Sequence, residues 1–374
     1  MATDGDFYGV AYGGSAGFGA LYRITPKGNY KVVYNFRDVG DGANPLYAPI
    51  QASDGSLYGI TEGDIVNTQP TIYKYSAAGT VTTVFTLPAD GSEGKFFGSP
   101  VLQADDSNLY VTTASGGRYD CGTILKVTTA GVLLGQYNFY CKQYGGLPNG
   151  RLIQAADGNL YGETFDGGYD SRHCYGGCGT IYRMTPDGTV TLIYEFKQTF
   201  WWDSAVPEGG LLQGTDGNLY GVSAAGGGQK PYGTIYMMST GGAETILDYL
   251  DYSSREGHNP SNPFMQHTNG KFYSTMLDGG VHGAGTVYSL DMGLSPFITF
   301  VQPTGKVGGT AQILGQGFTG TSNVTFNGIP ASRFFVNSDT SMTAVVPEGA
   351  TSGRVVVVTP TGTLTSNVDY RISH

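Results

Sequence analysis

Three side chains near the middle of the chain, Glu163, Asp166 and His173, are of the types that carry acid–base chemistry. A pair of carboxylic acids could hydrolyse a glycosidic bond, and the separation of the two would set the stereochemical outcome. Alternatively, Arg172 and His173 could neutralise a uronate and take its proton, as in polysaccharide elimination. We predict Glu163, Asp166 and His173 as catalytic residues; the competing interpretation is a polar loop without catalysis.

Glu163 stands out when similar segments of the same chain are compared. Two residues after the tyrosine of each segment stand, in order, Val10, Ile60, Thr112, Glu163, Val222 and Thr275. One carboxylate among small and β-branched residues predicts a side chain wedged between neighbouring sheets. Burial there would raise its pKa, as a general acid requires. The alternative is a buried carboxylate that is satisfied by an arginine or by backbone amides.

These segments are six copies of one repeat. Each contains a version of Asp-Gly-Asn-Leu-Tyr-Gly, a glycine-rich loop, Gly-Thr-Ile-Tyr, and a turn leading to a last strand, and the motif tyrosines are Tyr8, Tyr58, Tyr110, Tyr161, Tyr220 and Tyr273. Repeats of about fifty residues with several strands each predict the blades of a β-propeller. We expect six blades over residues 1–300, or seven in a longer parent protein. The first repeat lacks its inner strand, so we expect either that the ring closes imperfectly or that upstream sequence has been removed; a natural start at this point is the alternative to a removal.

From about Ser295 the repeat stops, and short strands with Gly, Asn and Pro turns follow. This pattern predicts a β-sandwich over residues 301–374 and an all-β protein. The C-terminal residues resemble an IPT/TIG immunoglobulin-like domain. The motifs Asp-Gly-Asn-Leu-Tyr-Gly, Gly-Thr-Ile-Tyr and Pro-Asp-Gly-Thr-Val-Thr resemble the tandem "GloVer" repeat of secreted bacterial proteins, which often end in such a sandwich. That resemblance supports the propeller and implies no particular activity.

Composition excludes some partners. The net charge of −10 and the pI near 4.8 argue against nucleic acid, which requires a basic face. No run of about 18 apolar residues is present, so we expect no membrane span. Glycine (60 residues) and tyrosine (27 residues) are abundant, as many short strands joined by tight turns require.

The four cysteines predict two disulfides. Cys174 and Cys178 share one loop, whereas Cys121 opens a strand and Cys141 closes the strand expected beside it. A zinc site is the alternative, but it would need four convergent ligands, and the spacings match no usual zinc motif. Disulfides imply a secreted or cell-surface location.

The loops, unlike the turns, differ from repeat to repeat. A variable loop face on a repeated scaffold is where binding normally develops. Exposed tryptophan rings stack on sugars, and both tryptophans lie in one loop between repeats four and five. We predict that a polysaccharide or oligosaccharide binds on this face near those repeats, with contacts from Trp201, Trp202, Arg172, Tyr175, Arg118, Tyr12 and Glu62.

Three functions stay open at this point: a glycoside hydrolase or polysaccharide lyase, a non-catalytic binding module, and an adhesion scaffold whose sandwich contacts other extracellular proteins. We expect no cofactor and no metal site. Asp38, Asp41 and Asn44 could hold calcium, but the usual ligand loop is missing. We expect His258, His267 and His282 to be solvated loop residues.

Overall fold

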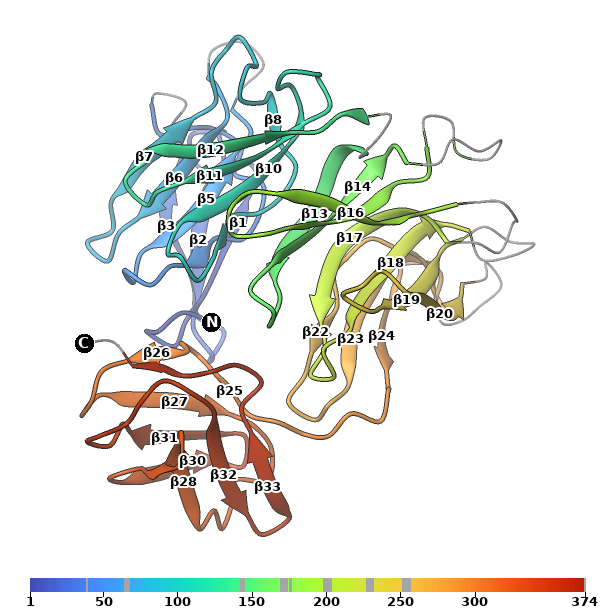
Figure 1. Cartoon of the computed structure of the whole chain (residues 1–374). Coiled ribbons are helices and arrows are strands. Elements are labelled where there is room, and N and C mark those ends of the chain that lie inside the picture. The colour runs from blue at the N-terminus through green and yellow to red at the C-terminus, as the bar shows by residue number, and fades with distance from the viewer. Residues whose placement is uncertain are drawn as a thin grey trace. The chain divides into compact units, whose positions relative to one another are not determined.

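The computed structural model describes residues 1–37, 40–63, 68–141, 145–168, 174, 177–197, 204–226, 232–250 and 257–372. Within these ranges the named secondary-structure elements are all β-strands, and none is a helix (Figure 1). The predicted all-β class is therefore confirmed. Among the described residues there is no helix of the length and hydropathy that a membrane crossing needs.

The chain divides into two compact units, which we describe separately. The repeat unit comprises Phe7–Phe264 and Ser274–Tyr288. The C-terminal unit comprises Met1–Asp6, Met265–Tyr273 and Ser289–His374. The domain boundary expected at residue 300 stays a prediction.

Each repeat forms one antiparallel sheet, and the first sheet lacks the inner strand, as its sequence predicts. In the third and sixth sheets the inner strand is split into two short strands. The strands, from the first repeat to the sixth, are β1 (Phe7–Ala11), β2 (Ala20–Ile24), β3 (Tyr30–Asn35); β4 (Ile50–Gln51), β5 (Leu57–Thr61), β6 (Thr71–Tyr75), β7 (Val81–Thr86); β8 (Phe96–Phe97), β9 (Leu102–Gln103), β10 (Leu109–Ser115), β11 (Thr123–Val127), β12 (Leu133–Asn138); β13 (Gly146–Gln154), β14 (Leu160–Asp166), β15 (Thr180–Met184), β16 (Val190–Glu195); β17 (Ala205–Gln213), β18 (Leu219–Ala225), β19 (Thr234–Met238), β20 (Glu244–Tyr249); β21 (His258–Pro260), β22 (Met265–Gln266), β23 (Phe272–Asp278) and β24 (Thr286–Leu290).

A tyrosine lying across a glycine is the recurring contact inside the sheets. Gly162 of Leu-Tyr-Gly pairs with Tyr182 of Gly-Thr-Ile-Tyr, and a Cβ on this glycine would lie 2.3 Å from the tyrosine Oη. The same contact recurs in repeats one, two and five. In repeat three Val111 pairs with Leu125, so a larger residue replaces glycine where a smaller one replaces tyrosine. In repeats one, two, four and five the tyrosine ring therefore occupies the side-chain space of the motif glycine, whereas in repeat six Ser274 stands beside Tyr288.

Neighbouring sheets are joined by an aromatic contact and by a glutamine. The phenylalanine that follows the last strand of one repeat packs edge-on against the tyrosine of the next, as in Phe196 and Tyr236, whose ring centroids are 5.5 Å apart. On the inner strand, Gln154 donates to the Gly158 carbonyl of its own turn and accepts from the Asp105 amide of the preceding repeat. Both contacts join the third sheet to the fourth and the fourth sheet to the fifth.

The motif aspartate caps the turn that precedes the second strand. Asp157 accepts hydrogen bonds from the Asn159 amide and from the Tyr161 hydroxyl, and equivalent bonds to tyrosine recur at Asp54, Asp106 and Asp216. These turns are therefore structural, as their near-identity in the sequence indicates.

The C-terminal unit contains two four-stranded sheets with strand orders β25-β27-β31-β30 and β29-β28-β32-β33. Both contribute side chains to one buried cluster, including Ile313 and Met342 from the first and Phe326 and Val357 from the second. The strands of this region are β25 (Thr299–Phe300), β26 (Thr304–Gly305), β27 (Thr310–Leu314), β28 (Asn323–Phe326), β29 (Ile329–Pro330), β30 (Phe334–Ser338), β31 (Ser341–Val345), β32 (Val355–Thr359), β33 (Gly362–Thr365) and β34 (Arg371–Ile372).

The tyrosine–glycine contact predicts a large penalty for one added methyl group. We expect Gly162→Ala to lower the free energy of unfolding by about 1–3 kcal/mol, because the Cβ overlaps the Tyr182 ring and hydroxyl. Gly135→Ala is the matched control, since that strand glycine has no atom within 4 Å of an added Cβ. Urea unfolding measures both variants, and equal stability of the two would contradict the packing argument.

Candidate functional site

Glu163 lies on β14 and reaches from the fourth sheet into its contact with the fifth. One carboxylate oxygen accepts a hydrogen bond from the Tyr236 hydroxyl at 2.5 Å, and the other accepts one from the Gly210 amide at 3.0 Å. The residue is 1% exposed. The expected burial between neighbouring sheets is therefore observed, and the carboxylate is satisfied by a tyrosine and a backbone amide.

Comparison with the first two repeats suggests what this carboxylate does for the fold. Val10, which stands in the first repeat where Glu163 stands in the fourth, packs in one cluster with Tyr73 of the second repeat. The Tyr73 hydroxyl is buried and has no hydrogen-bond partner among the residues described. The equivalent tyrosine of the fifth repeat, Tyr236, donates to Glu163. Glu163 therefore satisfies a buried hydroxyl that an aliphatic side chain leaves unsatisfied.

The electrostatics of Glu163 follow from its burial. Desolvation raises the pKa of its carboxyl group to about 7, although the hydrogen bonds from Tyr236 and Gly210 oppose the increase. The negative charge of Glu208 raises this pKa further. A carboxylic acid with this pKa could exchange a proton near neutral pH, but both its oxygens are occupied by protein donors. Its predicted catalytic role stays a prediction.

Asp166 does not join Glu163 in a carboxylate pair on one face. The two residues are three positions apart on β14, and side chains alternate between the faces of a strand, so they point to opposite faces. Asp166 is half-buried at the end of the strand, and this burial raises the pKa of its carboxyl group. The predicted catalytic role of Asp166 stays a prediction.

Both predicted disulfides are confirmed. Cys121 is bonded to Cys141 with a Cα–Cα distance of 5.5 Å, and Cys174 is bonded to Cys178 with a distance of 5.1 Å. The first disulfide links the loop after β10 to the connection between the third and fourth sheets. The Leu147 amide also donates to the Cys121 carbonyl, which holds this loop against the start of β13.

Arg118 lies in the same loop beside two exposed tyrosines. Its guanidinium stands over the Tyr119 ring at 5.4 Å from the centroid, and Tyr119 packs edge-on against Tyr140 with centroids 5.2 Å apart. Tyr119 is 45% exposed and Tyr140 is 43% exposed. Cys121 comes shortly after Arg118 and Tyr119 in the chain, and Cys141 comes directly after Tyr140. The disulfide between the two cysteines therefore fixes both of the loops that bear these tyrosines. We call Arg118, Tyr119 and Tyr140 the tyrosine platform.

Tyr12 and Glu62 lie in loops of the first and second repeats. Tyr12 is 66% exposed, and Glu62 is also exposed. Burial raises the pKa of Tyr47, and the charges of Glu62 and Tyr12 raise it further. The predicted contributions of Tyr12 and Glu62 to ligand binding stay predictions.

Five of the predicted site residues lie outside the described ranges. They are Arg172, His173, Tyr175, Trp201 and Trp202. Their predicted contributions to ligand binding and catalysis stay predictions.

Two charged residues on the inner strands are absent from the sequence-based prediction. Arg151 lies on β13, three residues before the glutamine of the inner strand. At the same position the other repeats that have this glutamine carry an uncharged residue: Ala48, Pro100, Gly210 and Pro263. The place of Glu208 on β17 is held elsewhere by Leu46, Gly98, Asn149 and Ser261. Desolvation lowers the pKa of Arg151 and raises the pKa of Glu208. Aligning the repeats on their glutamines reveals both residues.

Metal coordination finds little support among the described residues. No group of three or more His, Cys, Asp or Glu side chains gathers there. Asp41, considered above for calcium, accepts hydrogen bonds from the Tyr34 hydroxyl and the Arg37 amide, and the Asn44 amide group donates to the Gly63 carbonyl. His258 is buried and packs edge-on against Tyr232, which corrects the expectation of a solvated loop histidine.

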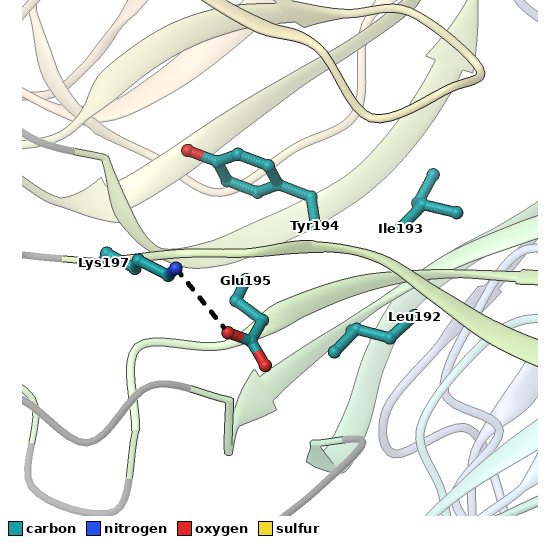
Figure 2. A pocket seen from close by; sticks show the side chains of 5 residues that line it. All are labelled: Leu192, Ile193, Tyr194, Glu195 and Lys197. Atoms are coloured by element: carbon teal, nitrogen blue, oxygen red, sulfur yellow. Dashed lines mark ion pairs between the residues drawn. The ribbon is translucent and has the colours of Figure 1, made fainter.

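A cavity of about 300 Å³ lies over the outer strand of the fourth sheet. It is lined by Leu192, Ile193, Tyr194, Glu195 and Lys197, which come from one short stretch of chain (Figure 2). Glu195 pairs with Lys197 at 3.9 Å, and the Tyr194 hydroxyl donates to Glu244 of the next repeat. Of the predicted site residues that the structure describes, none lines this cavity.

The raised pKa of Glu163 predicts a pH-dependent stability. The folded pKa of about 7 exceeds the ordinary value of 4.5, so the folded state keeps a proton that the unfolded chain releases between these two values. The free energy of unfolding therefore decreases as pH rises from 4.5 to about 7, by on the order of 3 kcal/mol. Glu163→Gln should abolish this decrease, because glutamine can still accept from Gly210 and donate to Tyr236.

Urea unfolding at pH 5 and pH 8 tests this expectation. Tyr236→Phe is the companion variant, since it removes a hydrogen bond that holds the pKa of Glu163 down. Its stability should continue to fall above pH 7. A Glu163→Gln protein with the same pH dependence as the wild type would show that another group causes the effect.

Comparison with known proteins places the chain in a family. No functionally curated protein matches the sequence. The similar solved structures include virginiamycin B lyase from Staphylococcus aureus, at 13% identity and a TM-score of 0.48, covering 92% of this chain and 96% of that one. A luciferin-regenerating enzyme has 12% identity and a TM-score of 0.43, covering 74% and 86%. The extracellular domain of a protein described as a hybrid two-component system from B. thetaiotaomicron has 10% identity and a TM-score of 0.41, covering 97% and 55%.

Similarity at this level transfers no activity. The sequence itself matches the Gloeobacter/Verrucomicrobia repeat over residues 1–222 and 171–329, which together span most of the chain. The matched ranges include all six motif tyrosines and the sheets that they organise. The chain therefore belongs to the Gloeobacter/Verrucomicrobia repeat family.

Proposed function

We propose that this chain is an extracytoplasmic β-propeller of six blades, followed by an IPT/TIG-like immunoglobulin-type sandwich, and that its loop rim binds a polysaccharide or oligosaccharide. The six repeat sheets and the contacts from each sheet to the next support the propeller. The shared core of two four-stranded sheets supports the sandwich.

The disulfides support an extracytoplasmic location. All four cysteines of the sequence are paired, and none is free. Structural disulfides persist in oxidising compartments and are rare where thiols are kept reduced. Secretion, or display at the cell surface, follows from this argument and from the expectation that accompanies the repeat.

The tyrosine platform is the observation that carries the proposed binding function. Tyr119 and Tyr140 expose their rings, and a disulfide fixes the two loops that bear them. A rigid tyrosine presents a large apolar surface at little cost in conformational entropy, and its hydroxyl can form hydrogen bonds. Sugars offer both an apolar ring face and hydroxyl groups, so they match such a surface. Trp201 and Trp202, which the sequence predicts as ligand contacts, belong to the same proposed function.

The tyrosine platform also lies at the end of the sheet where the sequence predicts that the variable loops bind a ligand. β10 and β12 run in the same direction, because each pairs antiparallel with β11, and the loops that follow them bear Tyr119 and Tyr140. The capping aspartates lie in the turns at the other end of these strands. The variable loops and the structural turns are thus separated onto opposite rims of each sheet.

Loss of the platform should weaken glycan binding. We expect Tyr119→Ala and Tyr140→Ala each to reduce affinity at least tenfold, because truncating a central aromatic residue of an interface costs about 2 kcal/mol. A glycan array followed by calorimetry on the best ligand measures this loss. Trp201→Ala and Trp202→Ala belong in the same series.

Tyr30→Ala is the matched control for the platform variants. Tyr30 is 58% exposed and packs against Tyr22 with centroids 5.3 Å apart, but it lies beside the turn between β2 and β3 on the other rim. Its replacement should leave binding unchanged. If all variants bound as the wild type does, or if the array were empty, carbohydrate recognition would be refuted and the adhesion scaffold would become the better hypothesis.

Catalysis is a second candidate, and the pKa of Glu163 near 7 is the observation that favours it. A hydrolase or lyase would use this group as an acid or base. Glu163→Gln would then lose turnover on the bound polysaccharide while keeping its affinity. Release of reducing ends and absorbance of unsaturated products distinguish the two reactions. If the wild type shows no turnover, and if Glu163→Gln binds the polysaccharide as tightly as the wild type does, the results support a binding module.

A further inference from the structure

The tyrosine platform contains a cation that no carboxylate of the described residues neutralises. Arg118 is exposed, and its guanidinium contacts the Tyr119 ring rather than an acid. Its amide donates to the Asn138 side chain at 2.7 Å, which fixes the backbone from which the side chain extends. A guanidinium stacked on an aromatic ring keeps its N–H donors at the edge of the plane, where a planar anion can accept two of them.

The acid nearest in sequence already has a partner. Asp120 pairs with Lys95 at 2.7 Å and also accepts a hydrogen bond from the Gly116 amide. These contacts lower the pKa of Asp120, with the bond from Lys95 as the largest cause. Asp120 therefore stays ionised and engaged beside Lys95. The positive charge of Arg118 is left for a ligand.

The net charge of the protein restricts which anion can approach. A chain with a net charge of −10 repels a polyanion over the Debye length, which is about 8 Å at physiological ionic strength. One carboxylate on an otherwise neutral glycan experiences little of this repulsion and gains the full contact with Arg118. A sugar ring that carries the carboxylate can also lie against the tyrosines.

We infer that the tyrosine platform recognises a glycan bearing an isolated carboxylate, such as a uronic acid in a neutral chain, with the carboxylate bound by Arg118 and the ring packed on Tyr119 and Tyr140. The inference rests on the proposed function and specifies the ligand of that site. Arg118 is a specificity-determining residue in this arrangement, because neutral sugars would use the tyrosines alone.

An array of matched sugars tests the inference. Each uronate-bearing oligosaccharide is presented together with its methyl ester, its carboxyl-reduced form and a polyuronate of the same sugar. The full-length protein should bind the isolated acid about ten- to hundredfold more tightly than the ester, which is the range expected for hydrogen bonds to a charged group. Arg118→Gln should remove this preference while keeping the affinity for the ester.

Arg333→Gln is the matched control variant. Arg333 also lies over an exposed aromatic ring, that of Phe335, at 6.0 Å, but it belongs to the C-terminal unit. Equal binding of acid and ester by the wild type, with binding still lost in Tyr119→Ala, would overturn the inference and leave the proposed function intact. Tightest binding to the polyuronate would overturn the argument for an isolated charge. Absence of binding to every sugar would refute both proposals.

Discussion

Packing of one tyrosine ring against the backbone of the adjacent strand is the contact on which the repeat unit depends. Tyr182 covers Gly162 within its own sheet, and its other face receives Phe139 from the preceding repeat at a centroid distance of 5.0 Å. One ring therefore fixes both the strand pairing and the spacing to the next sheet. Because interiors are close-packed, a larger residue in place of the glycine requires room, and in repeat three the smaller Leu125 provides it opposite Val111.

The tyrosine at this position also carries a buried hydroxyl group, and in repeat five Glu163 accepts the hydrogen bond from that hydroxyl. A tyrosine buried this deeply carries its hydroxyl into a region without water, and an unsatisfied hydroxyl there costs free energy. In repeat two the Tyr73 hydroxyl has no partner among the described residues, whereas in repeat five the Tyr236 hydroxyl donates to Glu163. The stabilisation from this hydrogen bond is offset by the cost of burying the Glu163 carboxyl group. The same burial raises the pKa of Glu163. The most unusual residue of the repeats thus serves the contact between two sheets.

The sequence alone predicts the features that recur from repeat to repeat. It also predicts the burial of a residue that differs from its equivalents in the other repeats, provided that its position in the strand assigns it to a face. Strand order and both disulfides follow from repeated turns and from cysteine positions at strand ends. The burial of Glu163 follows from its alternation with Tyr161. Its partner Tyr236 could not be predicted, because the two are 73 residues apart and that tyrosine occurs in other repeats without such a bond.

The inner strands and loops were harder to predict for different physical reasons. Arg151 and Glu208 lie where the register of the inner strand shifts, so alternation of side chains no longer assigns a face. The pairing of Tyr119 with Tyr140 joins two loops that occupy non-equivalent positions of the repeat. Comparing equivalent positions cannot reveal such a contact. Only the disulfide next to it, Cys121–Cys141, indicates that these loops meet.

The distribution of negative charge follows from the same division between turns and loops. Asp54, Asp106, Asp157 and Asp216 are held by tyrosine hydroxyls in the turns that precede the second strands. For Asp106, the bond from Lys126 and bonds from Asn108 and Tyr110 hold the pKa at about 2 despite partial burial. Hydrogen bonds also lower the pKa of Asp54 and of Asp157 against the effect of burial, so these two carboxylates and Asp106 keep their negative charge at physiological pH. On the loop rim the Asp120 carboxylate is paired with Lys95, and no acid among the residues that the structure describes is paired with Arg118. An acidic protein can in this way present a local cation to a ligand, because the acid that stands closest to Arg118 in the sequence, Asp120, is held by Lys95 and by the Gly116 amide.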